Sequence, residues 1–187
     1  DGSKVGSEFV VNSSTAGMQY SPAITALAAG QFVVTWSDNG SATVRAQVFN
    51  GDGSKSGAEF VVDSNTTYES TTSIDALPDG RFVATWEHGS NEYGGDVSDV
   101  FAQVYNTDGS TSGARFQIGT NTAGGQFDPS VTALADGRLA VIWEDAGSGA
   151  VRGQVFDPRT AAVTLTGTSL GDQWVGTAFN DFMQGAA

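Results

Sequence analysis

The stretch SPAITALAAGQFVVTW (21–36) decides the fold, because the chain repeats it twice. The second copy is TTSIDALPDGRFVATW (71–86), and the third is DPSVTALADGRLAVIW (128–143). Each copy follows a segment of the type DGSKVGSEFVVN (1–12) and precedes one of the type VRAQVFN (44–50). Self-similarity at a period of roughly 50 residues is typical of a repeat architecture. The chain is therefore built from three copies of one unit.

Each unit is predicted to contain four short β-strands. In the first copy these strands are expected at 8–11, 22–27, 31–36 and 44–49. A tight turn at Gly30, and Asp-Gly turns at Gly80 and Gly137, join the second and third strands as hairpins. The third strand carries apolar residues on both faces, so both faces must be covered. A four-stranded unit buried on both sides fits the blade of a β-propeller.

We therefore predict an all-β fold of three four-stranded, propeller-like blades within residues 1–166. The repeats are placed at 1–51, 52–107 and 108–158, with a closing strand at 159–166. A β-trefoil is the alternative, since it also has three four-stranded units. Propellers usually have about four to eight blades, and three blades in a row leave two apolar faces uncovered. We expect the chain to associate with itself, most simply as a six-bladed dimer.

The composition excludes several kinds of partner and site. The chain has 21 acidic and 8 basic residues, a net charge of -13, which repels nucleic acid. Its apolar stretches are too short to cross a bilayer, so no membrane insertion is expected. There is no cysteine, and His88 is the one histidine, so neither a disulfide nor a zinc site can be assembled.

The last segment, GTSLGDQWVGTAFNDFMQGAA (167–187), has a nine-residue period of its own. Gly167 recurs as Gly176 and Asp172 as Asp181, which matches two positions of the nonapeptide pattern G-G-x-G-x-D-x-U-x. An apolar residue also stands at the eighth position of both copies. The segment resembles the first, degenerate nonapeptides of an RTX, or hemolysin-type calcium-binding, array.

The blade repeats also resemble the repeats of large secreted RTX proteins of Gram-negative bacteria. This resemblance implies the short start of a β-roll at 167–187, cut off by truncation. It also implies an extracellular or bacterial cell-surface location, and Ca²⁺ as the ion that Asp172 and Asp181 would bind. Calcium takes about six to eight oxygen ligands, so these two carboxylates alone are not expected to complete a site.

Two turns are further candidates for calcium. Asn50 and Asp52 in one turn, and Asn106 and Asp108 in the other, place side-chain oxygens at alternate positions, as short calcium loops do. A plain Asp-Gly turn gives the same pattern.

An acidic, glycine-rich insertion at 88–99 distinguishes the second repeat. It is a candidate ligand-binding loop, organised by calcium, with one aromatic contact; a solvated loop is the alternative. Its candidate residues are Glu87, Glu92, Tyr93, Asp96 and Asp99.

Two sets of repeated residues are assigned to packing. One glutamine recurs in each fourth strand and is expected to bind backbone groups between blades. One tryptophan ends each third strand and is expected in the core. The glutamines are Gln47, Gln103 and Gln154, and the tryptophans are Trp36, Trp86 and Trp143.

Glu87 and Glu144 hold equivalent positions after two of these tryptophans and could act as the carboxylate pair of a glycosidase. Ser37 occupies the third equivalent position, which favours a structural role instead. We therefore expect the chain not to be an enzyme but a non-catalytic, extracellular adhesion or assembly module, associated with calcium and able to bind glycan. The alternatives are a purely structural protein that assembles into rings or filaments, and a carbohydrate-active enzyme.

Overall fold

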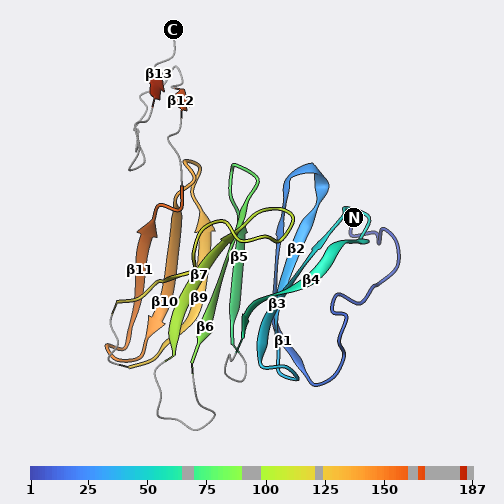
Figure 1. Cartoon of the computed structure of the whole chain (residues 1–187), viewed down its shortest axis with the longest axis horizontal. Helices are drawn as coiled ribbons and strands as arrows, with labels where there is room; N and C mark the ends of the chain where they lie inside the picture. The colour runs from blue at the N-terminus through green and yellow to red at the C-terminus, as the bar shows by residue number, and fades with distance from the viewer. Residues whose placement is uncertain (65–69, 90–97, 121–123, 160–163, 167–181, 185–187) are drawn as a thin grey trace.

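The computed structural model describes residues 1–64, 70–89, 98–120, 124–159, 164–166 and 182–184 (Figure 1). Within these ranges the chain is all-β: three antiparallel sheets and one parallel pair of strands, with a single 3-10 turn at Ala28–Gly30 and no α-helix. The described ranges hold no helix that could span a membrane.

The three sheets stand side by side and are called blades 1, 2 and 3 (Figure 1). Blade 1 consists of β1 (Gln19–Ala26), β2 (Phe32–Asp38), β3 (Thr43–Phe49) and β4 (Lys55–Ser64). Blade 2 consists of β5 (Thr72–Ala76), β6 (Phe82–His88), β7 (Asp99–Tyr105) and β8 (Phe116–Gln117). Blade 3 consists of β9 (Gln126–Ala133), β10 (Leu139–Asp145) and β11 (Ala150–Phe156). In each sheet, strands that follow one another in the chain are neighbours.

The predicted hairpin turns are confirmed. Gly30, Gly80 and Gly137 have φ angles of 77°, 92° and 86°. Each lies between the first and second strands of its blade. A residue with a Cβ is strained in this left-handed region, so glycine is the residue that these turns require.

The blades are offset by one strand from the sequence repeats. The segment 8–11, predicted as a strand, is not one in the structure, and its equivalent 59–62 lies within β4, the last strand of blade 1. The reason is the short turn at Asn50–Ser54, in which Asn50 N donates to Ser54 O (2.8 Å). This turn folds the following residues back along β3 as a hairpin. A blade therefore ends with the strand that opens the next repeat.

The core lies in the seams between blades. At the first seam, residues such as Val33 and Val48 of blade 1 pack against Phe82 and Tyr105 of blade 2. At the second seam, Val83, Val100, Ala102 and Val104 of blade 2 pack against Leu139, Val141 and Trp143 of blade 3. All three repeated tryptophans are buried, as predicted.

The two outer faces of the array differ, contrary to the expectation that both are bare. Residues of the N-terminal segment cover the outer face of blade 1: Val11 packs on Val34 and Trp36, and the rings of Phe9 and Phe49 lie 5.5 Å apart. On the outer face of blade 3, Ile142, Val151 and Val155 are exposed to 50%, 71% and 46%.

The first strands of the three blades, β1, β5 and β9, lie next to one another. Asp75 of β5 bonds to both neighbours. Its Oδ1 accepts from Thr25 Oγ1 (3.3 Å), and its Oδ2 accepts from Thr132 Oγ1 (3.1 Å) and Ala133 N (2.8 Å). One carboxylate thus links all three blades.

The remaining strands, β12 (Thr164–Thr166) and β13 (Phe182–Gln184), pair in parallel. Thr164 lies opposite Phe182, eighteen residues further along the chain. β12 falls within the predicted closing strand 159–166, but its partner is β13 and not β11. The described residues close neither a propeller ring nor a trefoil.

Candidate functional site

Glu87 is the centre of the candidate site. It follows Trp86 near the end of β6 and is only 7% exposed, because blade 3 covers this face of blade 2. Its backbone is held by Ser70, whose hydroxyl donates to Glu87 O (2.6 Å).

Two groups donate hydrogen bonds to the side chain of Glu87. Thr71 Oγ1 and Asp128 N both donate to Glu87 Oε1, the second at 2.6 Å. Burial raises the pKa of the Glu87 carboxyl, and the negative charges of Asp128 and Glu144 raise it further, while the two hydrogen bonds lower it. The net pKa lies above the ordinary value of 4.5. The side chain is therefore prepared to hold a proton.

Asp128 reaches Glu87 through an unusual backbone conformation. Its φ angle of 50° lies in the left-handed region, next to an irregularity in the pairing of β9 with β10. This conformation costs of order 1–3 kcal/mol for a residue that is not glycine and clusters at functional sites. The side chains of Asp128 and Glu144 are exposed. The site therefore combines one buried carboxyl, whose pKa is raised, with two exposed acidic side chains.

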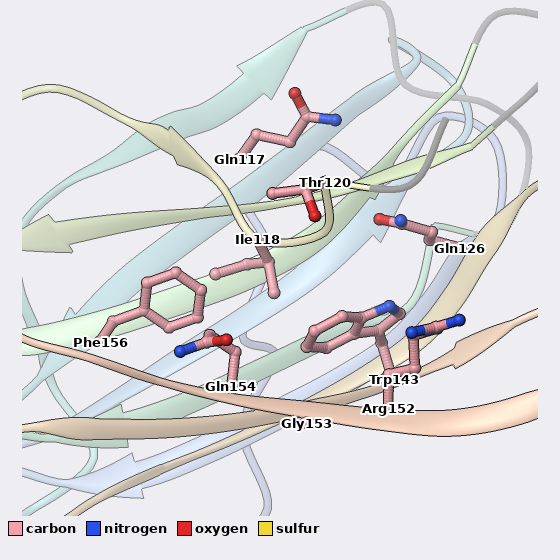
Figure 2. Close-up of a pocket in the computed structure, with 9 residues that line it drawn as sticks. All are labelled: Gln117, Ile118, Thr120, Gln126, Trp143, Arg152, Gly153, Gln154 and Phe156. Atoms are coloured by element: carbon pink, nitrogen blue, oxygen red, sulfur yellow. The ribbon is translucent and has the colours of Figure 1, made fainter. Parts of the chain in front are cut away.

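A cavity of about 480 Å³ opens at the outer part of the seam between blades 2 and 3, and we call it the seam pocket (Figure 2). Figure 2 shows the indole of Trp143 on one side, with the guanidinium of Arg152 beside it, and Ile118 and Thr120 facing them. The remaining lining residues are Gln117, Gln126, Gly153, Gln154 and Phe156.

The two predicted calcium turns use their side-chain oxygens internally. Asp52 Oδ1 accepts from Ser54 N (2.9 Å) and Ser54 Oγ (2.6 Å), and Asp108 makes the same two bonds with Ser110. The two bonds lower the pKa of both aspartates, and the bond from the serine hydroxyl contributes most. Asn50 and Asn106 each donate to the same serine hydroxyls. The described geometry is that of two equivalent Asp-Gly turns.

Of the predicted ligand loop, the structure places two residues. Glu87 lies in the site above, and Asp99 begins β7 opposite His88. Glu92, Tyr93 and Asp96 lie outside the described residues, as do Asp172 and Asp181. Among the residues that are described, no group of three or more His, Cys, Asp or Glu side chains could hold a metal ion.

The repeated glutamines bind backbone groups within their own blade. Gln47 Nε2 donates to Val48 O (2.8 Å) and to the carbonyls of β4, and Gln103 Nε2 donates to Val104 O (2.8 Å) and Gly113 O (3.2 Å). Gln154 is exposed and lines the seam pocket. The first two have a packing role, within one sheet and not between blades.

The fold is similar to that of known solved structures, whereas no family model and no curated protein matches the sequence. One is the NanB sialidase of Streptococcus pneumoniae, at 14% identity and a TM-score of 0.51, over 73% of this chain and 23% of that one. Another is the intramolecular trans-sialidase of Ruminococcus gnavus, at 14% identity and 0.50, over 73% and 32%. A protein of unknown function from Dyadobacter fermentans matches at 10% identity and 0.51, over 73% and 50%. The chain thus spans about a quarter to a third of the length of the two sialidases.

These comparisons define the fold as a propeller-like array of the type found in sialidases. The expectation that the chain is not an enzyme is therefore wrong as far as the fold is concerned. The solved structures that share this fold include sialidases, which are glycosidases. Equivalent positions in successive blades do not have equivalent environments. Glu87 and Glu144 differ in burial, and only the structure reveals this.

Several residues of the site were not singled out from the sequence, Asp128 and Arg152 among them. Asp128 stands where the first repeat has Ser21, and both residues have φ angles near 50°. The replacement of serine by a carboxylate at this position was a signal that could have been read. Arg152 gave no such signal, because arginine occupies the same place in the first repeat, as Arg45.

Proposed function

We propose that this chain forms part of a carbohydrate-active enzyme, the second alternative that the sequence left open. The observation that carries the proposal is the raised pKa of the buried Glu87 carboxyl beside the carboxylates of Asp128 and Glu144. A buried carboxyl with a raised pKa, beside exposed carboxyl groups, is a candidate general acid. The sialidase-type fold supports the same class of substrate.

In the proposed reaction Glu87 acts as the general acid. Its proton passes to the glycosidic oxygen as the bond from that oxygen to the anomeric carbon breaks, so that the leaving group departs as a neutral alcohol. Asp128, which is exposed, assists from the other side as nucleophile or as the base that activates water. Thr71 and the backbone N–H of Asp128 keep the acid in place.

The test is the substitution Glu87→Gln, with fluorogenic methylumbelliferyl glycosides, sialosides among them, as substrates. The glutamine oxygen can still accept both hydrogen bonds, so the fold is kept while the transferable proton is lost. We expect the rate of hydrolysis to fall about 100-fold or more, as for the loss of a general acid. Glu8→Gln, an exposed residue of the N-terminal segment, is the matched control and should leave the rate unchanged. Equal rates for wild type and Glu87→Gln, or no turnover of any glycoside, would contradict the proposal.

We further propose that the chain continues from blade 3 into the β-roll of a secreted, calcium-binding RTX-type protein, which would place it outside the cell. The parallel pairing of β12 with β13 supports this proposal. Their offset of eighteen residues equals two nonapeptides, and stacked nonapeptide repeats form parallel β-helices.

A further inference from the structure

Residues 9–11, which we call the spare segment, lie on blade 1 in the place of a fourth strand of a preceding blade. The ring of Phe9 packs on Phe49 of blade 1, with centroids 5.5 Å apart and ring planes at 47°. The fourth strands of blades 1 and 2, β4 and β8, pack on the following blade in the same way. The equivalent ring pairs are Phe60 on Tyr105, at 5.5 Å and 45°, and Phe116 on Phe156, at 5.5 Å and 46°.

Blade 3 has the opposite deficiency, because among the described residues β11 pairs only with β10. Its equivalents β3 and β7 pair with a fourth strand on their other edge. In blade 2, Ile118 N donates to Val100 O (2.8 Å), and Val151 of β11 holds the position of Val100. The other two repeated glutamines also donate to backbone carbonyls in or just before the fourth strand, and Gln154 has no such bond within the described ranges.

The exposed apolar residues of the two outer faces occupy positions that a seam buries elsewhere. On blade 3, Val151 and Val155 are exposed to 71% and 46%, and the valines at their positions in blades 1 and 2 are exposed to at most 3%. On blade 1, Ile24 is 65% exposed, whereas Ile74 and Val131 at its position in blades 2 and 3 are each 7% exposed. The outer face of blade 3 and the outer face of blade 1, with its spare segment, are therefore the two halves of one missing seam.

We propose that this seam forms between two copies of the chain, and that the spare segment of one copy completes blade 3 of the other. Within one chain the spare segment and β11 lie at opposite ends of the row, with blade 2 between them (Figure 1). The occupant of the free edge is therefore a second copy. Strand addition to a sheet edge takes its affinity from backbone hydrogen bonds and its specificity from alternate side chains. With both contacts made, two copies hold six four-stranded blades in a closed ring.

The register of the added strand follows from the fourth strands within the chain. Their phenylalanines lie opposite an alanine of the preceding strand, Phe60 opposite Ala46 and Phe116 opposite Ala102. The same antiparallel pairing puts Phe9 of one copy opposite Gly153 of the other, and Val10 opposite Arg152.

Cross-linking between copies that each carry one cysteine tests both the strand and its register, since the chain has no cysteine of its own. A copy with Val10→Cys is mixed with a larger, tagged copy with Arg152→Cys, and the disulfide between them is followed on a non-reducing gel. Val10 is 65% exposed and the Arg152 side chain 46%, so both positions are open to oxidation. The control mixture is Val10→Cys with Val151→Cys. Val151 is more exposed than Arg152, but its side chain points to the other face of β11.

We expect the disulfide between the two kinds of copy to form about tenfold faster or more in the first mixture than in the control, because pairing raises the effective concentration of the two thiols. Val11→Lys gives a second readout without cysteine. It places a charge between the spare segment and Trp36, and should shift the mass in light scattering toward one chain with an unchanged far-UV spectrum.

Equal rates in the two mixtures, or an unchanged mass for Val11→Lys, would overturn the proposal. A chain that carries both Val10→Cys and Arg152→Cys distinguishes the source of the added strand. It should form disulfides between copies, and a disulfide within one chain would overturn the assignment to a second copy.

Discussion

Glu87 and Glu144 are the same residue at the same place in two successive blades, and burial alone separates them. Blade 3 covers Glu87, while Glu144 lies on the outer face of blade 3 and is exposed. A carboxyl taken out of water favours its protonated form. Position in the row of blades, more than local sequence, decides which glutamate can act as an acid.

The raised pKa of Glu87 has a consequence for stability that the substitution Glu87→Gln isolates. Between the unfolded value near 4.5 and the higher folded value, the native state holds more protons than the unfolded state. The free energy of unfolding therefore falls as pH rises through this window, and the contribution is fully present only below it. Glu87→Gln does not titrate, so its thermal midpoint relative to wild type should rise from pH 4 to pH 8. Glu8→Gln should show no such trend, and a constant difference for Glu87→Gln would exclude a raised pKa.

At the level of strands and turns, the sequence predicts most of the strands and hairpins. It does not predict at which strand one blade ends and the next begins. The alternation of residues in 31–36 and the turn at Gly30 correctly predicted a hairpin and a strand buried on both sides. The segment 8–11 was assigned to the wrong place, because a repeat can be divided at any strand and only pairing partners settle the division. The contact between Glu87 and the backbone of Asp128 joins residues 41 apart across a seam, and no local pattern encodes it.

The parallel pair at the end of the described chain can be tested by cross-linking. The chain has no cysteine, so Leu165→Cys with Met183→Cys creates a single pair, at positions that lie directly opposite in β12 and β13. We expect a disulfide to form in air, since neighbouring strands bring Cα atoms within the 4.4–6.8 Å that a disulfide spans. Mass spectrometry of the digested protein detects it. Leu165→Cys with Gln184→Cys, one residue out of register, should form the bond much more slowly. Equal rates for the two pairs would rule out the observed register.

At the level of the whole molecule, the row of blades ends in the exposed outer face of blade 3. The equivalent face of blade 2 is buried. Val151 and Val155 are exposed, whereas their equivalents in blade 2, Val100 and Val104, are covered by blade 3. The surface that fits such a face is another blade of the same repeat, and a second copy of the chain carries three. The predicted self-association therefore remains the expectation.

Light scattering at micromolar concentration is the measurement for this expectation. Wild type should have at least twice the mass of one chain. Val151→Lys should shift the mass toward the monomer, because it places a charge on the exposed face of blade 3. Val5→Lys, at a position that is 99% exposed in the N-terminal segment, is the matched control and should have no effect. A monomeric wild type would refute the expectation.

Asp75 gives the three blades a property that stacked repeats do not have by default. In a linear array each unit interacts only with its nearest neighbours, so unfolding can begin at one end and stop at any boundary. The carboxylate of Asp75 accepts hydrogen bonds from blade 1 and from blade 3 at once. Opening of blade 2 on either side therefore removes a hydrogen bond that helps to position this carboxylate for the other side. This single side chain favours one cooperative melting unit over three independent ones.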